Sequence, residues 1–567
     1  MKSFSKFFIP VLAAGLFAAC SDDNNDSPML PEDGPAEGVN MTISLKLPTT
    51  VGGRATDAAG NPVGTETAKE FESNIKEVLL VLADPTTDAF IASAVTTTMD
   101  VDATDKTKVT AKSTFNKSVL SNYITSLSSN PEKAEVNVYA FCNPTKEFKD
   151  VMATRTRGDQ ATLWANEFTT LSADDLEYNK VFAAKAIPMA NKKVTKLNLP
   201  AKSAIEAGTY AEDYYDMGNI NVVRSIARFD YKNGGKNNNN TYSIDIKTPD
   251  GTVEDALTIE LTHMALVNLS KSYFLLHRVA PDNATTLYDG ANGVTLAGDY
   301  DDTRIADVDW DWKAKATTGY TNNFFYSSTG AASSWNRIEI NSLTNDDDED
   351  ASWNANNTNG DYKIWRYVTE NTIPGTPQNQ KTGVSTGVVF RGVLKANDKT
   401  PEAFKTTLEG KTEPVYVYKD GNMFASWDEV KAEAEKEGNE NTAIKAAYDA
   451  CKDITDATAR DAKAVEQGFT IYRYDDDVDA YCTLYYYWNR HVDNNNAGVM
   501  GEKEFGVVRN NVYKLSVTEI SGLGHTRKPG DDPDPVDPND PDEKSDVKIK
   551  VSCIVDPWSV RVNNIKF

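Results

Sequence analysis

Clustered acidic residues are the groups in this sequence that most resemble a site for a metal ion. Segments 299–311, 346–350 and 475–479 each carry several Asp residues, whose carboxylates could bind Ca²⁺. None has the EF-hand arrangement, with Gly at the sixth position and Glu at the twelfth. We therefore interpret these segments as solvated loops and predict no metal site and no cofactor, with structural calcium as the alternative.

Residues typical of catalysis are sparse. The chain has four His and no Cys-x-x-Cys pair, and it lacks the G-x-S-x-G, H-E-x-x-H and P-loop motifs. His491, beside Asp493, has only Cys482 as a nearby candidate nucleophile. His263 and His277 lie in apolar segments typical of a core or a sheet edge. We predict no catalytic residues and conclude that the chain is not an enzyme.

The aromatic run Tyr485-Tyr486-Tyr487-Trp488 could form a platform for a sugar. In a strand, however, successive side chains point to opposite faces, which favours a run that is half core and half surface. A carboxylate pair for glycoside hydrolysis could also lie among the 84 acidic residues, because its separation is spatial and not sequential. A surface lipoprotein that binds or hydrolyses glycans is therefore the alternative function.

The whole chain has the composition of a globular protein. Its 567 residues are 40% hydrophobic, which is enough for two or three domains with cores of their own. The 84 Asp and Glu against 59 Lys and Arg give a net charge of −25, and we find no basic patch. This charge would repel a polyanion, so nucleic acid is not an expected partner.

The N-terminus has the layout of an export signal. Lysines precede an apolar run, residues 7–19, which is too short to span a bilayer and is followed by Cys20. Phe-Ala-Ala-Cys resembles the lipobox of bacterial lipoproteins, in which the Cys becomes the lipidated first residue. Residues 1–20 are therefore expected to be a lipoprotein signal peptide, with palmitate among the lipids on Cys20. A plain secretory signal with an incidental Cys is the alternative, and both imply the cell envelope or surface.

The first strand expected in the mature chain covers residues 39–47. Its residues alternate between apolar and polar, and the predicted buried face consists of Met41, Ile43, Leu45 and Leu47. A loop rich in Gly, Ala, Thr and Pro follows, with Arg54 at its exposed centre. Cleavage between Arg54 and Ala55 would free this strand, so residues 21–54 are interpreted as a tether and a removable strand.

The next part of the chain predicts an all-β sandwich over residues 55–235. Segments 75–82, 134–141 and 221–231 read as strands, with little helical periodicity between them. The stretch NGGKNNNN at 233–240 marks the expected domain boundary, because Gly and Asn tolerate left-handed backbone and bury little.

A second β-sandwich is predicted over residues 236–529, with one small helical insertion. The insertion begins with a capping box, in which Ser426 accepts the amide of Glu429 and the Glu429 side chain returns to the amide of Ser426. A second helical stretch is expected at 442–451. Cys451 and Cys482 could form a disulfide or remain buried thiols.

The chain ends with a strand attached to a stiff spacer. Residues 530–544 contain seven acidic residues and four Pro, so this linker should stay extended over about 45 Å. In residues 545–567 apolar residues alternate with polar ones, at Val547, Ile549, Val551, Cys553, Val555, Trp558, Val560 and Val562. Such a strand must either fold back onto its own domain or enter another molecule. The long spacer favours the second possibility.

The first and last strands have matching alternation, which suggests how copies could join. Loss of the first strand would expose an apolar groove and unpaired strand edges, and the last strand of another copy could fill it by β-augmentation. A head-to-tail contact of this kind that does not close on itself generates a filament.

Several blocks of the sequence together resemble one protein family. They are MGEKEFGVVRNNVYKLSVTEISGLG (500–524), the acidic Pro-rich linker, DPWSVRVNNIKF (556–567), VVRSIARFDY (222–231), ALVNLSKSYFLLHRV (265–279) and YVTENTIPG (367–375). They are similar to the type V pilin (fimbrillin) family, in particular to the major subunit of the short, or minor, fimbria.

This resemblance implies a mainly β fold with two transthyretin-like β-sandwich domains and a C-terminal donor strand. It further implies lipoprotein export through Cys20, removal of the first strand by an Arg-specific protease at Arg54, and polymerisation by donor-strand exchange with residues 547–567. Lys46 competes as the cleavage position, but it lies within the expected strand.

The function implied is that of a structural fimbrial subunit at the outer membrane and cell surface, supporting adhesion and biofilm. Its expected partners are other copies of itself, tip and anchor subunits, the protease, and host or bacterial surface ligands.

Overall fold

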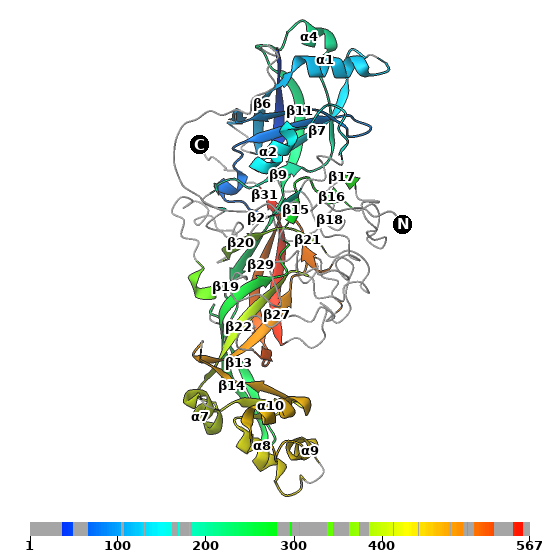
Figure 1. Cartoon of the computed structure of the whole chain (residues 1–567). Helices are drawn as coiled ribbons and strands as arrows, with labels where there is room; N and C mark the ends of the chain where they lie inside the picture. Colours follow the sequence, from blue (N-terminus) through cyan, green and yellow to red (C-terminus); the bar gives the residue numbers. More distant parts are fainter. Residues whose placement is uncertain are drawn as a thin grey trace, which may run out of the picture. The chain divides into compact units, whose positions relative to one another are not determined.

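The structure, a computed structural model, is built mainly from β-strands (Figure 1). It describes residues 37–48, 66–103, 107–129, 131–161, 168–170, 181, 184–236, 238–270, 272–279, 295–296, 305–306, 337–343, 362–372, 385–411, 413–439, 442–476, 478–491, 496, 504–526 and 548–559.

Nine strands of the N-terminal part form one mixed sheet. Their order is β4-β3-β7-β9-β11-β1-β6-β5, with β10 paired to β7. The strands are β1 (Gly38–Lys46), β3 (Val78–Ala83), β4 (Phe90–Thr96), β5 (Met99–Val101), β6 (Lys108–Asn116), β7 (Glu135–Cys142), β9 (Met189–Asn191), β10 (Thr195–Asn198) and β11 (Tyr215–Arg224).

The described N-terminal part also contains three α-helices, so the expectation of an all-β first half was wrong. They are α1 (Lys117–Ser126), α2 (Lys146–Ala153) and α4 (Lys202–Glu206). The Asn116 side chain accepts hydrogen bonds from the amides of Ser118 and Val119 and so caps α1. The helices are only 5 to 10 residues long, too short to give a clear helical period in the sequence.

Strand β3 is buried on both faces. Val78 and Leu80 join the core that also holds the apolar side chains of β1. Leu79 and Val81 lie in a second apolar cluster, together with Phe148 of α2. Burial on both faces explains why this strand is an uninterrupted apolar run and does not alternate.

Two further sheets share one core in the C-terminal part. The larger has the order β13-β14-β22-β27-β26, with β19 beside β14 and β30 beside β27, and the smaller has the order β2-β31-β29-β12-β20. Their strands are β2 (Glu66–Thr67), β12 (Ala227–Lys232), β13 (Thr241–Thr248), β14 (Gly251–Val267), β19 (Arg337–Glu339), β20 (Lys363–Val368), β22 (Gly387–Ala396), β26 (Tyr474–Asp475), β27 (Ala480–Trp488), β29 (Asn511–Ile520), β30 (His525–Thr526) and β31 (Ile549–Ser559). Side chains from both sheets, such as Phe390 and Tyr513, belong to the same buried cluster, as in a β-sandwich.

The described chain also contains shorter elements outside these three sheets. Two are 3₁₀ helices, η1 (Glu70–Ser73) and η6 (Ile340–Ser342). Two are strand pairs, β8 (Phe168–Thr170) with β15 (Ser272–Phe274), and β21 (Asn371–Thr372) with β28 (Gly506–Val507). Two are three-stranded sheets, one of β16 (Arg278–Val279), β17 (Thr295–Leu296) and β18 (Ile305–Ala306), the other of β23 (Val415–Tyr418), β24 (Met423–Phe424) and β25 (Phe469–Tyr472).

The helical insertion contains α7 (Glu402–Gly410), α8 (Trp427–Ala434), α9 (Ala443–Asp449) and α10 (Ala457–Glu466). Ser426 accepts a hydrogen bond from the amide of Glu429, as the sequence predicts. The Glu429 carboxylate accepts from the amide of Ala425 at 2.6 Å, whereas the capping box predicts the amide of Ser426. Helices α8, α9 and α10 pack on β23 to β25 around Trp427 and Phe469, whereas Phe404 and Leu408 of α7 belong to the core of the two C-terminal sheets. The insertion is therefore a small layer with its own core.

The segment predicted as one strand, 221–231, is divided between two sheets. β11 ends at Arg224 in the N-terminal sheet, and β12 pairs with β20 and β29 in the C-terminal one. The passage between the sheets thus lies at residues 225–226, ahead of the boundary expected at 235. The Gly-rich stretch that suggested this boundary has a packing reason. A Cβ on Gly234 would lie 1.9 Å from the carbonyl oxygen of Val517, so the backbones approach there as only Gly allows.

Candidate functional site

Strand β1, drawn in dark blue in Figure 1, is an internal strand of the N-terminal sheet although it comes first in the described chain. It runs antiparallel to β6 and parallel to β11, so both of its edges are paired. Ile43 lies opposite Ala111 of β6 on one side and Gly218 of β11 on the other. Such a strand can leave without drawing other strands along, once its connection to β2 is cut.

The apolar face of β1 and the residue after it is buried as the alternation predicts. The side chains on this face are 0 to 3% exposed, and they are Val39, Met41, Ile43, Leu45 and Leu47. They belong to one core cluster with side chains from β3, β6, β7 and β11. At about 1.5 to 3 kcal/mol for each buried side chain, this face contributes roughly 10 kcal/mol before ordering costs.

The polar contacts at the start of β1 lie at the surface, whereas the buried Ser44 hydroxyl further along lies 3.3 Å from that of Thr110. Asn40 donates from its amide group to the carbonyl of Ala211 at 2.9 Å, and its side-chain oxygen accepts from the Thr114 hydroxyl at 2.6 Å. Glu37 forms an exposed ion pair with Lys117, which lowers the pKa of the Glu37 carboxyl through the hydrogen bond and the charge of Lys117. These surface contacts contribute little, because the alternating apolar face both fixes the register of the strand and supplies most of its stability.

Removal of β1 would open a gap in the sheet between β6 and β11. Strands β6 and β11 would each gain an unpaired edge, and the buried side chains opposite β1, such as Val109, Phe115 and Ile220, would lose their apolar cover. An open edge beside an apolar trough is the arrangement that accepts an added β-strand.

The last strand, β31, pairs with its own chain. It runs antiparallel to β29, with Val551 opposite Val517 and Cys553 opposite Leu515, and Figure 1 shows the two strands side by side. Ile549 is 6% exposed and lies in the C-terminal core, against which Val551 and Cys553 also pack. The expectation that the linker keeps this strand away from its own chain was therefore wrong. Instead, β31 folds back onto its own domain, which is the other of the two possibilities for this strand. It does so because β29 offers an edge with a matching apolar face.

The other end of β31 meets the segment that follows the predicted cleavage loop. Trp558 and Ser559 pair in parallel with Glu66 and Thr67 of β2. Val555 lies opposite Tyr513 in the β29 ladder. The predicted positions Cys20, Arg54, Ala55, Val547, Val560 and Val562 lie outside the described residues.

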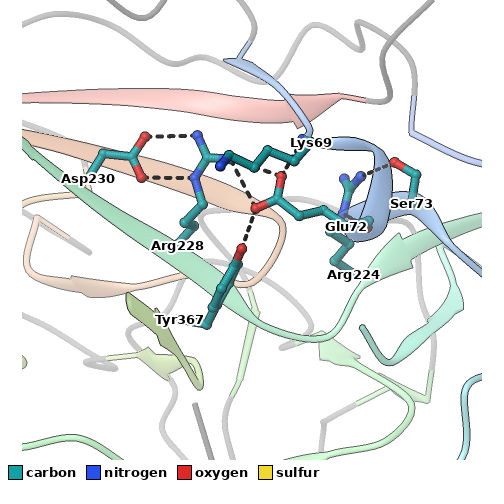
Figure 2. Close-up of polar contacts among 7 residues, drawn as sticks. All are labelled: Lys69, Glu72, Ser73, Arg224, Arg228, Asp230 and Tyr367. Atoms are coloured by element: carbon teal, nitrogen blue, oxygen red, sulfur yellow. Dashed lines mark hydrogen bonds and ion pairs between the residues drawn. The ribbon is translucent and has the colours of Figure 1, made fainter. Parts of the chain in front are cut away.

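A buried charged network surrounds Glu72 (Figure 2). We call it the Glu72 network, and it consists of Lys69, Glu72, Ser73, Arg224, Arg228, Asp230 and Tyr367. Arg228 binds Asp230 through two hydrogen bonds of 2.8 Å and donates to both carboxylate oxygens of Glu72, at 3.2 and 3.0 Å. The Tyr367 hydroxyl donates to Glu72 at 2.5 Å. Glu72, Arg228 and Asp230 are fully buried.

Arg224 joins the network to the N-terminal sheet, because it is the last residue of β11. Its Nε donates to the backbone carbonyl of Glu72 at 3.0 Å, and its NH2 donates to the Ser73 hydroxyl at 3.1 Å. Burial lowers the pKa of Arg224 to about 10, although the negative charge of Glu72 acts in the other direction and raises it. The side chain therefore stays charged at neutral pH.

The Glu72 network has no signature in the local sequence. Its members come from η1, β11, β12 and β20, and no local spacing connects these elements. The available signal was the charged residues Arg224, Arg228 and Asp230 in the largely apolar segment 222–231, because a charge in a buried strand requires a partner.

The residues weighed for chemistry have structural contacts. His491 lies 2.9 Å from the Tyr513 hydroxyl, and His263 lies beside Arg391. Of the Asp cluster at 475–479, Asp479 pairs with Lys411 and Tyr474. Within the part of the chain that the structure describes, no group of three or more His, Cys, Asp or Glu could hold a metal ion.

The cysteines and the aromatic run also have defined places. No disulfide joins the described cysteines Cys142, Cys451, Cys482 and Cys553, and the first three are buried. Burial raises the pKa of the Cys142 thiol to about 12. Tyr485 and Trp488 are buried, whereas Tyr486 and Tyr487 are half-buried, so the run does not form an open platform. Among the described residues, no helix has the length and apolar character needed to cross a bilayer.

Comparison with protein families identifies the region that contains the last strand. Residues 480–564, which include β27, β29 and β31, match the family described as major fimbrial subunit protein type IV, fimbrillin, C-terminal. This part of the chain is fimbrillin-like. The resemblance expected from the sequence is thus confirmed for the region that holds the blocks at 500–524 and most of 556–567.

Several solved structures are similar to the chain. A candidate cell adhesion protein from Parabacteroides distasonis is 11% identical, with 93% of this chain and 99% of that chain covered and a TM-score of 0.40. A fimbrilin from Porphyromonas gingivalis is 12% identical, with 92% and 98% covered and a TM-score of 0.33. The tip fimbrial protein Mfa3 from the same species, with C-terminal truncation, is 8% identical, with 92% and 100% covered and a TM-score of 0.33. Comparison with curated proteins gave no significant match.

Proposed function

We propose that this chain is a structural subunit of a cell-surface fimbria. It is exported as a lipoprotein through Cys20, anchored at the outer membrane, cleaved after Arg54 and polymerised head-to-tail by donor-strand exchange. Its partners are further copies of itself, tip and anchor subunits, an Arg-specific protease, and host or bacterial surface ligands in adhesion and biofilm. It acts as a building block and not as an enzyme, and the fimbrillin match at residues 480–564 supports this role.

The position of β1 is the observation that carries the proposal. This strand lies inside the sheet, is paired along both edges and precedes the predicted loop that contains Arg54. Cutting that loop separates β1 from the chain without breaking any other strand. The site left behind has two free edges and an apolar floor, and only another strand with the same alternation can satisfy both.

The last strand supplies that alternation, and before assembly it is stored on β29. Of its side chains at 549, 551 and 553, only Ile549 is fully buried, whereas β1 and Leu47 bury five apolar side chains. In the slot of β1, the half-buried side chains of Val551 and Cys553 would become covered on both sides, which increases the apolar area that these two side chains bury. This difference gives the transfer a favourable direction.

A peptide experiment tests the proposal. The loop around Arg54 is cut in purified protein, and a labelled peptide of residues 547–567 is added. We expect the peptide to bind the cut protein, to displace the β1 fragment and not to bind the uncut protein. A peptide with Val551→Asp serves as the control, because a charge on the alternating apolar face should prevent insertion. Equal binding of both peptides, or no binding of either, would contradict donor-strand exchange.

A further inference from the structure

The segment 66–73 lies directly after the loop with the predicted cleavage site, and it is attached in two ways. β2 pairs with the end of β31, and η1 enters the Glu72 network. Ala68 and Phe71 also lie in an apolar cluster with Ile226, Ile364 and Val512 of the C-terminal part. The chain on this side of the loop is thus fixed by both charged and apolar contacts.

Glu72 is the central residue of this attachment. Its carboxylate accepts from Arg228, from the Tyr367 hydroxyl and from the backbone amide of Lys69, the last at 2.6 Å. Loss of Glu72 would leave Arg228 with Asp230 as its one remaining carboxylate in the network, and would leave the Tyr367 hydroxyl without this acceptor. Breaking a buried ion pair by removing one partner is costly, because the other charge stays desolvated.

The two segments that flank the loop are therefore held by different physical means. β1 is held by sheet hydrogen bonds, an apolar face and surface polar contacts, all of which an incoming strand can reproduce. Segment 66–73 is held by buried charges that no incoming strand of the same alternation supplies.

We propose that the Glu72 network is an anchor that divides the N-terminal segment into a part that leaves and a part that stays. This inference rests on the proposed function, in which the cut after Arg54 releases β1. The anchor keeps residues 66–73 on β12 and β20 after the cut. Until β31 is donated to a neighbour, β2 remains beside Trp558 and Ser559. Before and after that step, the Glu72 network gives the processed subunit a fixed N-terminal end instead of a loose one.

Hydrogen exchange measured by mass spectrometry tests the anchor. A recognition sequence for a specific protease replaces part of loop 49–65, so that the cut does not depend on Arg54. After cleavage of the otherwise wild-type chain and addition of the peptide 547–567, which displaces the β1 fragment, we expect segment 38–47 to lose protection while segment 66–73 keeps it. In Glu72→Gln, protection of 66–73 after the cut should fall by about a hundredfold, because Arg228 loses a charged partner in a buried site.

A milder variant and a matched control complete the experiment. Tyr367→Phe removes one hydrogen bond to Glu72 and preserves the ring, so it should lower protection of 66–73 by about tenfold even if Glu72→Gln does not fold. Glu135→Gln removes an exposed carboxylate that lies 3.8 Å from Lys196, and it should leave protection of 66–73 unchanged.

The outcomes separate the anchor from the proposed function. Loss of protection at 66–73 in the cut wild-type chain would overturn the anchor, as would unchanged protection in both network variants. Protection that persists at 38–47 after the cut and after addition of the peptide 547–567 would contradict the release of β1, whatever segment 66–73 does.

Discussion

Val551 of the last strand lies opposite Val517 of β29 in the same chain. Val517 is fully buried, and Val551 packs against the same core cluster. The last strand is therefore held by its own sheet in the structure, and donation to a neighbour requires this pair to separate. A covalent link between the two positions would prevent the separation.

The first prediction uses such a link. The double variant Val517→Cys/Val551→Cys places two cysteines at this cross-strand pair. The Cα atoms of such a pair lie about 4.5 to 5.5 Å apart in antiparallel sheets, which is within the range that a disulfide can bridge. We expect the oxidised variant to be exported and cleaved but not to polymerise, and reduction to restore assembly. Electron microscopy and denaturing gels measure the fibres. Val551→Cys alone is the control, and fibres formed by the oxidised double variant would show that separation is not needed.

The second prediction concerns the stability of β1. Leu45→Ala should lower the free energy of unfolding of the uncut protein by about 2 to 5 kcal/mol, because it leaves a cavity in a close-packed core. Lys46→Ala, at the neighbouring exposed position, should change it by less than about 0.5 kcal/mol. Chemical denaturation measures both values. Similar effects of the two substitutions would mean that the apolar face does not hold the strand.

The third prediction concerns pH. Lys117 lowers the pKa of the Glu37 carboxyl below its ordinary value of 4.5, so the folded state favours the ionised form. The contribution of this pair is fully present above pH 4.5 and is lost as the pH falls through the lowered pKa. Hydrogen exchange at the start of β1 should be faster in Glu37→Gln than in wild type at neutral pH, and the two should converge in acid.

The Glu37 pair is exposed, so this difference should be small and should shrink in high salt. A difference that grows as the pH falls would contradict the assignment.

The fourth prediction concerns the close approach at Gly234. Gly234→Ala places a methyl group 1.9 Å from the Val517 carbonyl oxygen, so β12 and β29 must separate. We expect a loss of about 1 to 3 kcal/mol in the free energy of unfolding, as is typical of overpacking. Gly522→Ala is the control, because its methyl group would meet only the flexible Lys548 side chain at 3.4 Å. Equal stability of the two variants would rule out the close approach.

The sequence predicted those elements whose structure depends on residues close to one another in the chain. The alternation at 39–47 predicts β1 and its buried face, and Ser426 with Glu429 predicts the start of α8, because both signals lie within one element. The short helices α1 and α2 were missed because only a few of their residues face a core.

Long-range pairing explains the remaining differences. The partner of β31 depends on which strand offers a free edge, and β29 becomes available only when the C-terminal sheet is assembled. Likewise, Glu72 and Arg228 are 156 positions apart, and only the folded chain brings them together. The first strand could thus be located from sequence, whereas the storage place of the last strand and the Glu72 network could not.

The two neighbours of β1 run in opposite directions, since β6 is antiparallel and β11 is parallel to it. A strand that enters the slot left by β1 would therefore form different hydrogen bonds in its two possible directions. To restore the original ladder it must run in the same direction as β1. Each added subunit would then repeat the orientation of the one before. A fibre built in this way has two chemically distinct ends, with a vacant slot at one end and an unused tail at the other, so growth and capping would take place at different poles.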